Sequence, residues 1–191
     1  MEKYLLVILV FTSNLLFSME RMEEWKNIQK KEDLYYITTE NKPFTGKIID
    51  TYPDNSLKME MEVKNGILNG ENKEYHPNGK LKFYMHFKNG KVHGLFREYF
   101  TNGNLKLVGK YKNGFRDGLV KIYYENGTLS NESYYNSGIL DGPYNSFHEN
   151  RKPLVKCFYK DNLLNGKQIL YDENGNIIEE NYYENGEKII E

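Results

Sequence analysis

Long stretches of the chain alternate strictly between apolar and polar residues. In residues 57–64 the odd positions hold Leu, Met, Met and Val, and the even positions hold Lys, Glu, Glu and Lys. Residues 81–88 repeat the pattern with Leu, Phe, Met and Phe at their odd positions. Alternation with a period of two is typical of a β-strand that has one buried and one wetter face. The chain is therefore predicted to be all-β.

Glycine divides these segments at fixed intervals. The lead glycines, as we call a first set, recur every 24 residues at Gly46, Gly70, Gly94, Gly118, Gly142 and Gly166. A second set follows nine residues later, at Gly79, Gly103, Gly127 and Gly175, with Asn55 and Arg151 in the first and fifth repeats. A third set lies twenty residues after the lead glycine, at Gly66, Gly90, Gly114, Gly138 and Gly186, with Asn162 in the fifth repeat. Asn usually precedes the second and third sets, and Asn-Gly favours a type I′ hairpin turn, which needs positive φ at both central residues. We interpret all three sets as structural turn residues.

Aromatic residues also recur in register. One column lies five residues after the lead glycine, at Tyr75, Tyr99, Tyr123, Phe147 and Tyr171. Another lies seventeen residues after it, at Phe87, Tyr111, Tyr135, Tyr159 and Tyr183. In stacked repeats such columns become ladders across the sheet, and their ordinary role is to stabilise strand pairing. The first column is also our candidate binding surface.

The glycine period sets the domain organisation. We predict six hairpin repeats in an elongated antiparallel β-meander, at residues 46–69, 70–93, 94–117, 118–141, 142–165 and 166–191. One repeat holds too few apolar side chains to fold without its neighbours. Residues 33–45 are interpreted as a degenerate half-repeat. Residues 19–32 are predicted to be a short helical segment, because Met22, Trp25 and Ile28 would share one stripe of a helix. The last repeat would leave a sheet edge open to a partner or to self-association.

Residues 1–18 are expected to be a signal peptide. The apolar stretch from Tyr4 to Phe11 follows Lys3 and is too short to span a bilayer as a helix, but it suits a signal-peptide core. Cleavage after Ser18 would send the protein to the periplasm or the medium. Glu2 beside Lys3 and the large Leu16 depart from the usual signal-peptide pattern, and a cytoplasmic location is the alternative.

Composition and charge exclude several classes of function. The 26 basic and 27 acidic residues nearly cancel, so no net field would attract nucleic acid. Cys157 is the single cysteine, which excludes an internal disulfide and a cysteine-based metal cluster. The four histidines, His76, His86, His93 and His148, lack metal-ligand spacing, and the glycines form no phosphate-binding run. No serine lies in a nucleophile elbow. We therefore expect no enzyme, no metal and no cofactor.

The repeat Gly-x4-Tyr-x2-Asn-Gly-x-Leu, followed by Phe or Tyr and then Lys-Asn-Gly, resembles the bacterial variant of the MORN repeat. Residues 94–112 and 118–135 carry the pattern best. The resemblance implies β-hairpin sheets without catalytic residues. The family's ancestral name refers to membrane occupation and recognition, and some bacterial members are catalogued as antitoxins of toxin–antitoxin pairs. The fifth repeat departs from the pattern at Arg151, Pro153 and Asn162, where we expect irregular turns.

Three functions are compatible with this sequence. The leading hypothesis is an exported protein-binding or scaffold module with an unknown protein partner, or with self-association through the open sheet edge. The second is a cytoplasmic antitoxin or immunity-type protein that neutralises a toxin by direct binding. The third is lipid head-group binding at the membrane surface, against which the balanced charge argues.

Overall fold

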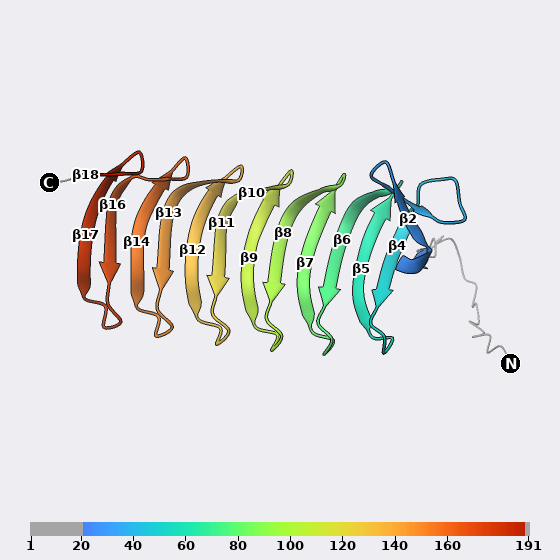
Figure 1. Cartoon of the computed structure of the whole chain (residues 1–191), viewed down its shortest axis with the longest axis horizontal. Helices are drawn as coiled ribbons and strands as arrows, with labels where there is room; N and C mark the ends of the chain where they lie inside the picture. The colour runs from blue at the N-terminus through green and yellow to red at the C-terminus, as the bar shows by residue number, and fades with distance from the viewer. Residues whose placement is uncertain (1–20, 190–191) are drawn as a thin grey trace, which may run out of the picture.

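One long sheet and one small sheet make up residues 21–189, the part of the chain that the computed structural model describes (Figure 1). The strands of the long sheet lie in the order β1-β4-β5-β6-β7-β8-β9-β11-β12-β13-β14-β16-β17-β18, with short β10 and β15 beside β9 and β14. Strands β2 and β3 form the small sheet at the N-terminal end. Apart from β1, which is parallel to β4, neighbouring strands are antiparallel. The predicted elongated antiparallel meander is confirmed.

The strands have these bounds: β1 Met22–Glu24, β2 Ile28–Lys31, β3 Leu34–Ile37, β4 Gly46–Thr51, β5 Leu57–Lys64, β6 Ile67–Tyr75, β7 Leu81–Lys88, β8 Lys91–Tyr99, β9 Leu105–Lys112, β10 Phe115–Arg116, β11 Gly118–Tyr123, β12 Leu129–Asn136, β13 Ile139–Phe147, β14 Pro153–Lys160, β15 Leu163–Leu164, β16 Gly166–Tyr171, β17 Ile177–Glu184 and β18 Glu187–Ile189. Within residues 21–189, one 3-10 turn, η1, covers Trp25–Asn27.

Two kinds of turn close the hairpins, one along each margin of the sheet. At the margin that we call the turn rim, both central residues have positive φ, as at Asn89 (51°) and Gly90 (77°), which is the type I′ geometry. At the other margin only the glycine has positive φ, as at Gly79 (79°), and its N–H donates to the carbonyl of His76 at 2.8 Å. That is a type I turn followed by a left-handed residue. The Asn-Gly pairs therefore occur in two different turns.

The fifth repeat makes the same turns as its neighbours, so the irregular turns expected there are wrong. Arg151 takes the left-handed position with φ 71°, and its N–H donates to His148 at 2.9 Å. Asp161 and Asn162 form the type I′ turn with φ of 51° and 67°. A hydrogen bond to the preceding repeat helps to hold this turn, because the N–H of Asn162 donates to the carbonyl of Leu140 in β13 at 2.9 Å.

Three lead glycines, Gly70, Gly94 and Gly142, lie within strands at β-bulges, and the other three begin β4, β11 and β16. Gly70 pairs normally with Phe87 on the following strand. Toward the preceding strand the register jumps from Met61 opposite Asn72 to Val63 opposite Leu68. Gly70 has a φ of 125°, a backbone conformation that residues with a side chain rarely adopt and that this bulge requires. The lead glycine thus offsets two neighbouring hairpins rather than reversing the chain.

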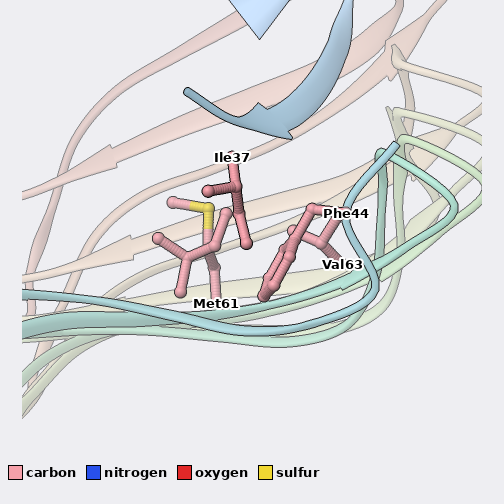
Figure 2. Packing of buried hydrophobic residues seen from close by; sticks show 5 residues of the cluster. Ile37, Phe44, Met61 and Val63 are labelled. Atoms are coloured by element: carbon pink, nitrogen blue, oxygen red, sulfur yellow. The ribbon is translucent and has the colours of Figure 1, made fainter. Parts of the chain in front are cut away.

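The main hydrophobic core lies under the small sheet. Ile37 and Phe44, from the N-terminal hairpin and its exit, pack on Ile48, Met61 and Val63 of the first repeat (Figure 2). We call this side of the long sheet the hairpin face and the opposite side, which bears Glu60 and Glu62, the open face. Because side chains alternate along each strand, strand register assigns the remaining residues to one face or the other.

The expected helix at residues 19–32 is wrong for the part that the structure describes. Residues 21–31 instead form β1, the single turn η1 and β2. Glu24, at the start of η1, makes no capping hydrogen bond with its side chain. A helix this short is marginal by itself, whereas β1 gains backbone partners from β4. The expected signal peptide, residues 1–18, lies outside the described residues. Between residues 21 and 189, no helix has the length and apolar character needed to cross a membrane.

Candidate functional site

The aromatic column proposed as a binding surface lies at the ends of β6, β8, β11, β13 and β16, and its side chains are half-buried. Tyr75 donates from its hydroxyl to a carboxylate oxygen of Glu60 at 2.8 Å. Burial, together with this hydrogen bond, raises the pKa of Tyr75 to about 12. The hydroxyl therefore stays protonated at neutral pH and serves as a hydrogen-bond donor to the neighbouring strand.

The same column receives hydrogen bonds from the preceding repeat. In each case the side chain of the residue six positions after a lead glycine forms a hydrogen bond with a backbone carbonyl of the next repeat. That carbonyl belongs to the residue five positions after the next lead glycine. Four such bonds join the repeats: Tyr52 Oη to Tyr75 at 2.7 Å, His76 Nε2 to Tyr99 at 3.0 Å, Tyr124 Oη to Phe147 at 2.7 Å and His148 Nε2 to Tyr171 at 3.3 Å. The column therefore belongs to the joints between repeats, and its role in binding stays a prediction.

A different set of rings is exposed on the open face. Tyr134, Phe158 and Tyr182 lie sixteen residues after successive lead glycines and are 41%, 42% and 40% exposed. Their register partners on the preceding strands are Leu119, Pro143 and Lys167. Successive rings are two strands apart, so they stand about 10 Å from one another in a row. We call these three residues the aromatic row.

Three apolar residues of the turn rim lie next to the aromatic row on the same face. Phe115, Ile139 and Leu163 are 58%, 40% and 46% exposed. Across their turns they pair with Lys112, Asn136 and Lys160, respectively. Those partners lie two positions after the residues equivalent to the aromatic row, so the three apolar residues also lie on the open face. The apolar patch, as we define it, consists of Phe115, Tyr134, Ile139, Phe158, Leu163 and Tyr182.

One lead glycine, Gly142, accommodates a ring of the aromatic row. A Cβ added at Gly142 would lie 2.8 Å from the Cβ of Tyr134, so the absence of a side chain at Gly142 leaves the space that Tyr134 covers. In the second repeat, Gly70 is covered in the same way by Glu62. At these two bulges the residue eight positions earlier covers the lead glycine, whereas a Cβ added at Gly118 or Gly166 would meet nothing within 4 Å.

In the first three repeats the open face is charged instead. The positions equivalent to the aromatic row hold Glu62, His86 and Lys110. Nearby, Lys73 forms ion pairs with Glu71 at 2.6 Å and with Glu60 at 3.5 Å. The charges of these side chains are paired within the chain. This half of the open face therefore offers a partner less apolar surface than the other half.

The sequence contained a signal for the apolar patch that the interpretation of aromatic columns missed. Adjacent aromatic residues occur at Tyr134-Tyr135, Phe158-Tyr159 and Tyr182-Tyr183. Since neighbouring side chains of a strand point to opposite faces, each pair puts one ring on each face. Only the second member of each pair was singled out from the sequence.

The described residues offer little for catalysis. Between residues 21 and 189, no group of three His, Cys, Asp or Glu side chains is placed to hold a metal. His86 Nδ1 lies 3.2 Å from the carbonyl oxygen of His93, and His76 and His148 belong to the inter-repeat bonds. Burial raises the pKa of Cys157 to about 11, so its thiol stays protonated and unreactive near neutral pH.

A surface hollow of about 330 Å³ separates the turns of the fourth and fifth repeats. It is lined by Gly127, Thr128, Leu129, Phe147 and Arg151. Phe147 is thus the one residue of the predicted column that borders this hollow. The hollow contains no acid–base pair, so a binding role fits it better than chemistry.

Comparison with protein families identifies the repeat. The model described as MORN repeat variant matches residues 68–89, 92–113, 116–137 and 164–185. Each match covers two consecutive antiparallel strands and the type I turn between them, as in β6 and β7. No match falls on the hairpin of β13 and β14, which contains Arg151 and Pro153. No curated protein matches the chain.

Proposed function

Because the chain belongs to the MORN repeat variant family through its tandem repeats at residues 68–185, we propose that it acts as a non-catalytic protein-binding or scaffold module. The apolar patch of the open face is where a protein partner binds. The observation that carries this proposal is the exposure of six large apolar side chains side by side on one face, each between 40% and 58% exposed.

The chemistry of the patch favours a protein partner. Contiguous exposed apolar side chains on a soluble protein usually mark an interaction site. Tyr and Phe are enriched at the centres of protein interfaces, where their rings bury a large area with few torsions. A repeat array also presents an extended surface on which several partner side chains bind at once.

Site-specific photocrosslinking tests the proposal. A benzophenone amino acid at position 158 should crosslink a protein partner in the native cells, and the same probe at position 62 should not. The two positions are equivalent in the repeat, so they differ mainly in the surface around them. Equal crosslinking from both positions, or none from either, would contradict a partner site at the apolar patch.

Export is part of the proposal, supported by the charged start and apolar run of residues 1–18. Mass spectrometry of the native protein should find a new N-terminus after Ser18. An intact N-terminus in the cytosolic fraction would favour the antitoxin hypothesis instead. Flotation with anionic vesicles at low salt separates both from lipid head-group binding, since a protein-binding module should stay with the soluble fraction.

A further inference from the structure

We propose that the protein bound at the apolar patch is a second copy of this chain. The two open faces meet in a two-fold symmetric dimer whose arrays run in opposite directions. This inference rests on the proposed function, because it names the protein that occupies the patch.

The turn rim carries opposite charges at the two ends of the patch. In the second repeat Lys88 and Lys91 face each other across a turn, and in the sixth repeat Glu184 and Glu187 do the same. All four side chains are exposed. Within residues 21–189 none of them forms a salt bridge. Two lysines at one end and two glutamates at the other are therefore available to an outside partner.

These charges are placed symmetrically about the middle of the patch. A two-fold axis parallel to the strands, between β12 and β13, exchanges β7 with β18 and β8 with β17 in the observed strand order. Lys88 then faces Glu187 of the second copy, and Lys91 faces Glu184 of the second copy. The same contacts occur twice, once at each end, as an isologous interface requires.

One row of strand positions at the centre of the same arrangement is apolar. The axis exchanges β11 with β14 and β12 with β13, so Leu119 faces Phe158 and Tyr134 faces Pro143 of the second copy. On the rim, Lys160 of one copy faces Phe115 of the other, whose ring is 58% exposed and open to a cation–π contact. Apolar residues at the centre and charges at the margin are the usual anatomy of a protein interface.

Two contacts in this arrangement are unfavourable by sign. Lys121 faces Lys156 of the second copy, since the axis exchanges β11 with β14, and Lys121 already lies 3.9 Å from a carboxylate oxygen of Glu132. Lys110 faces Lys167 of the second copy, since the axis exchanges β9 with β16. Lys167 is already paired with Glu180 at 2.9 Å, which lowers its repulsion toward a second lysine. Because both sheets are twisted, the distance between them increases toward the corners of the interface. The long Lys and Glu side chains of the turn rim are suited to bridge that distance.

Sedimentation equilibrium of the purified chain tests the dimer. The wild-type chain should be a dimer, and a Tyr134→Glu/Phe158→Glu variant should be a monomer with an unchanged circular dichroism spectrum. Lys88→Glu/Lys91→Glu should weaken dimerisation about tenfold or more, as like charges replace complementary ones. Glu184→Lys/Glu187→Lys should have the same effect.

Mixing the two charge variants gives the sharpest outcome. Each variant repels itself at both ends, whereas a one-to-one mixture restores both attractive contacts and should form heterodimers. A wild-type monomer at high micromolar concentration would overturn the inference, as would a dimer that neither pair of charge changes affects. If the chain is monomeric but crosslinks a different protein from position 158, only this inference fails. If position 158 crosslinks nothing, the proposed function fails as well.

Discussion

Repeats one to three and repeats four to six share a backbone but differ in the side chains they place on it. In the first half a lysine pairs with an acid at the start of each hairpin, as Lys58–Asp50 at 2.7 Å, Lys82–Glu74 at 2.6 Å and Lys106–Glu98 at 2.6 Å. In the second half the same positions hold Ser130 and Ile122, Leu154 and Ser146, and Ile178 and Leu170. The pattern of glycines and hairpin-face residues therefore specifies the fold, and the open face is free to vary.

The two halves also differ in how they are stabilised. The first repeat has a covered core, where Phe44 and Ile48 are 2% and 0% exposed. In the second half the buried residues include Val120, Asn131 and Ser133, and no second layer covers the described strands there. Hydrogen bonds between consecutive repeats are correspondingly more important in that half. The following substitutions separate these contributions, beginning with the largest.

Phe44→Ala should be the most damaging single change. It removes a ring that is 2% exposed and leaves a cavity against Met61 and Val63, at a cost of about 3–5 kcal/mol in the free energy of unfolding. Urea denaturation followed by circular dichroism measures it. The control is Phe115→Ala, whose ring is 58% exposed and whose loss should change stability by less than about 0.5 kcal/mol. Equal losses in the free energy of unfolding from both variants would show that the packing of Phe44 on the first repeat does not stabilise the fold.

Gly142→Ala tests the bulge in the second half of the array. Gly142 has φ of 139°, and an added Cβ would lie 2.8 Å from the Cβ of Tyr134, so we expect a loss of about 2 kcal/mol. Gly166→Ala is the matched control, because it has φ of 82° and nothing within 4 Å of the added Cβ. It should cost only the left-handed backbone strain, about 1 kcal/mol. Thermal unfolding of both variants decides, and a Gly166→Ala variant that is the less stable of the two would refute this account.

More of the fold than of the candidate site could be predicted from the sequence. Alternation in residues 57–64 and Asn-Gly spacing sufficed for the hairpins, because strand period and turn chemistry are local. The N-terminal strands were missed because β1 depends on pairing with β4, a contact distant in sequence. The lead glycines were interpreted as turns because positive φ serves a bulge as well as a turn. Which aromatic ring of Tyr134-Tyr135 is more exposed depends on how each ring packs on the neighbouring strands, and no local pattern contains that information.

Tyr124→Phe should have a smaller effect, confined to one joint between repeats. It removes the hydrogen bond from Tyr124 Oη to the Phe147 carbonyl at 2.7 Å, which typically contributes about 1 kcal/mol. Phe100 occupies the same position one repeat earlier and has no hydroxyl, so Phe100→Tyr is the reciprocal test. It should gain a bond to the Tyr123 carbonyl and slow amide exchange at that joint. Faster exchange in Phe100→Tyr would argue against a repeated inter-repeat bond.

Glu98→Gln should have the smallest effect, and it tests the charged half directly. The Lys106–Glu98 pair lies at 2.6 Å with side chains 44% and 20% exposed, a setting in which ion pairs contribute about 0.5 kcal/mol or less. The diagnostic result is salt dependence: raising the salt concentration should narrow the stability difference between wild type and Glu98→Gln, because salt screens the pair. Ser130→Ala, at the position equivalent to Lys106 in the fourth repeat, should show no such narrowing. A difference that persists unchanged in high salt would mean that Glu98 acts through packing, and that the two halves of the array differ less in electrostatics than their sequences indicate.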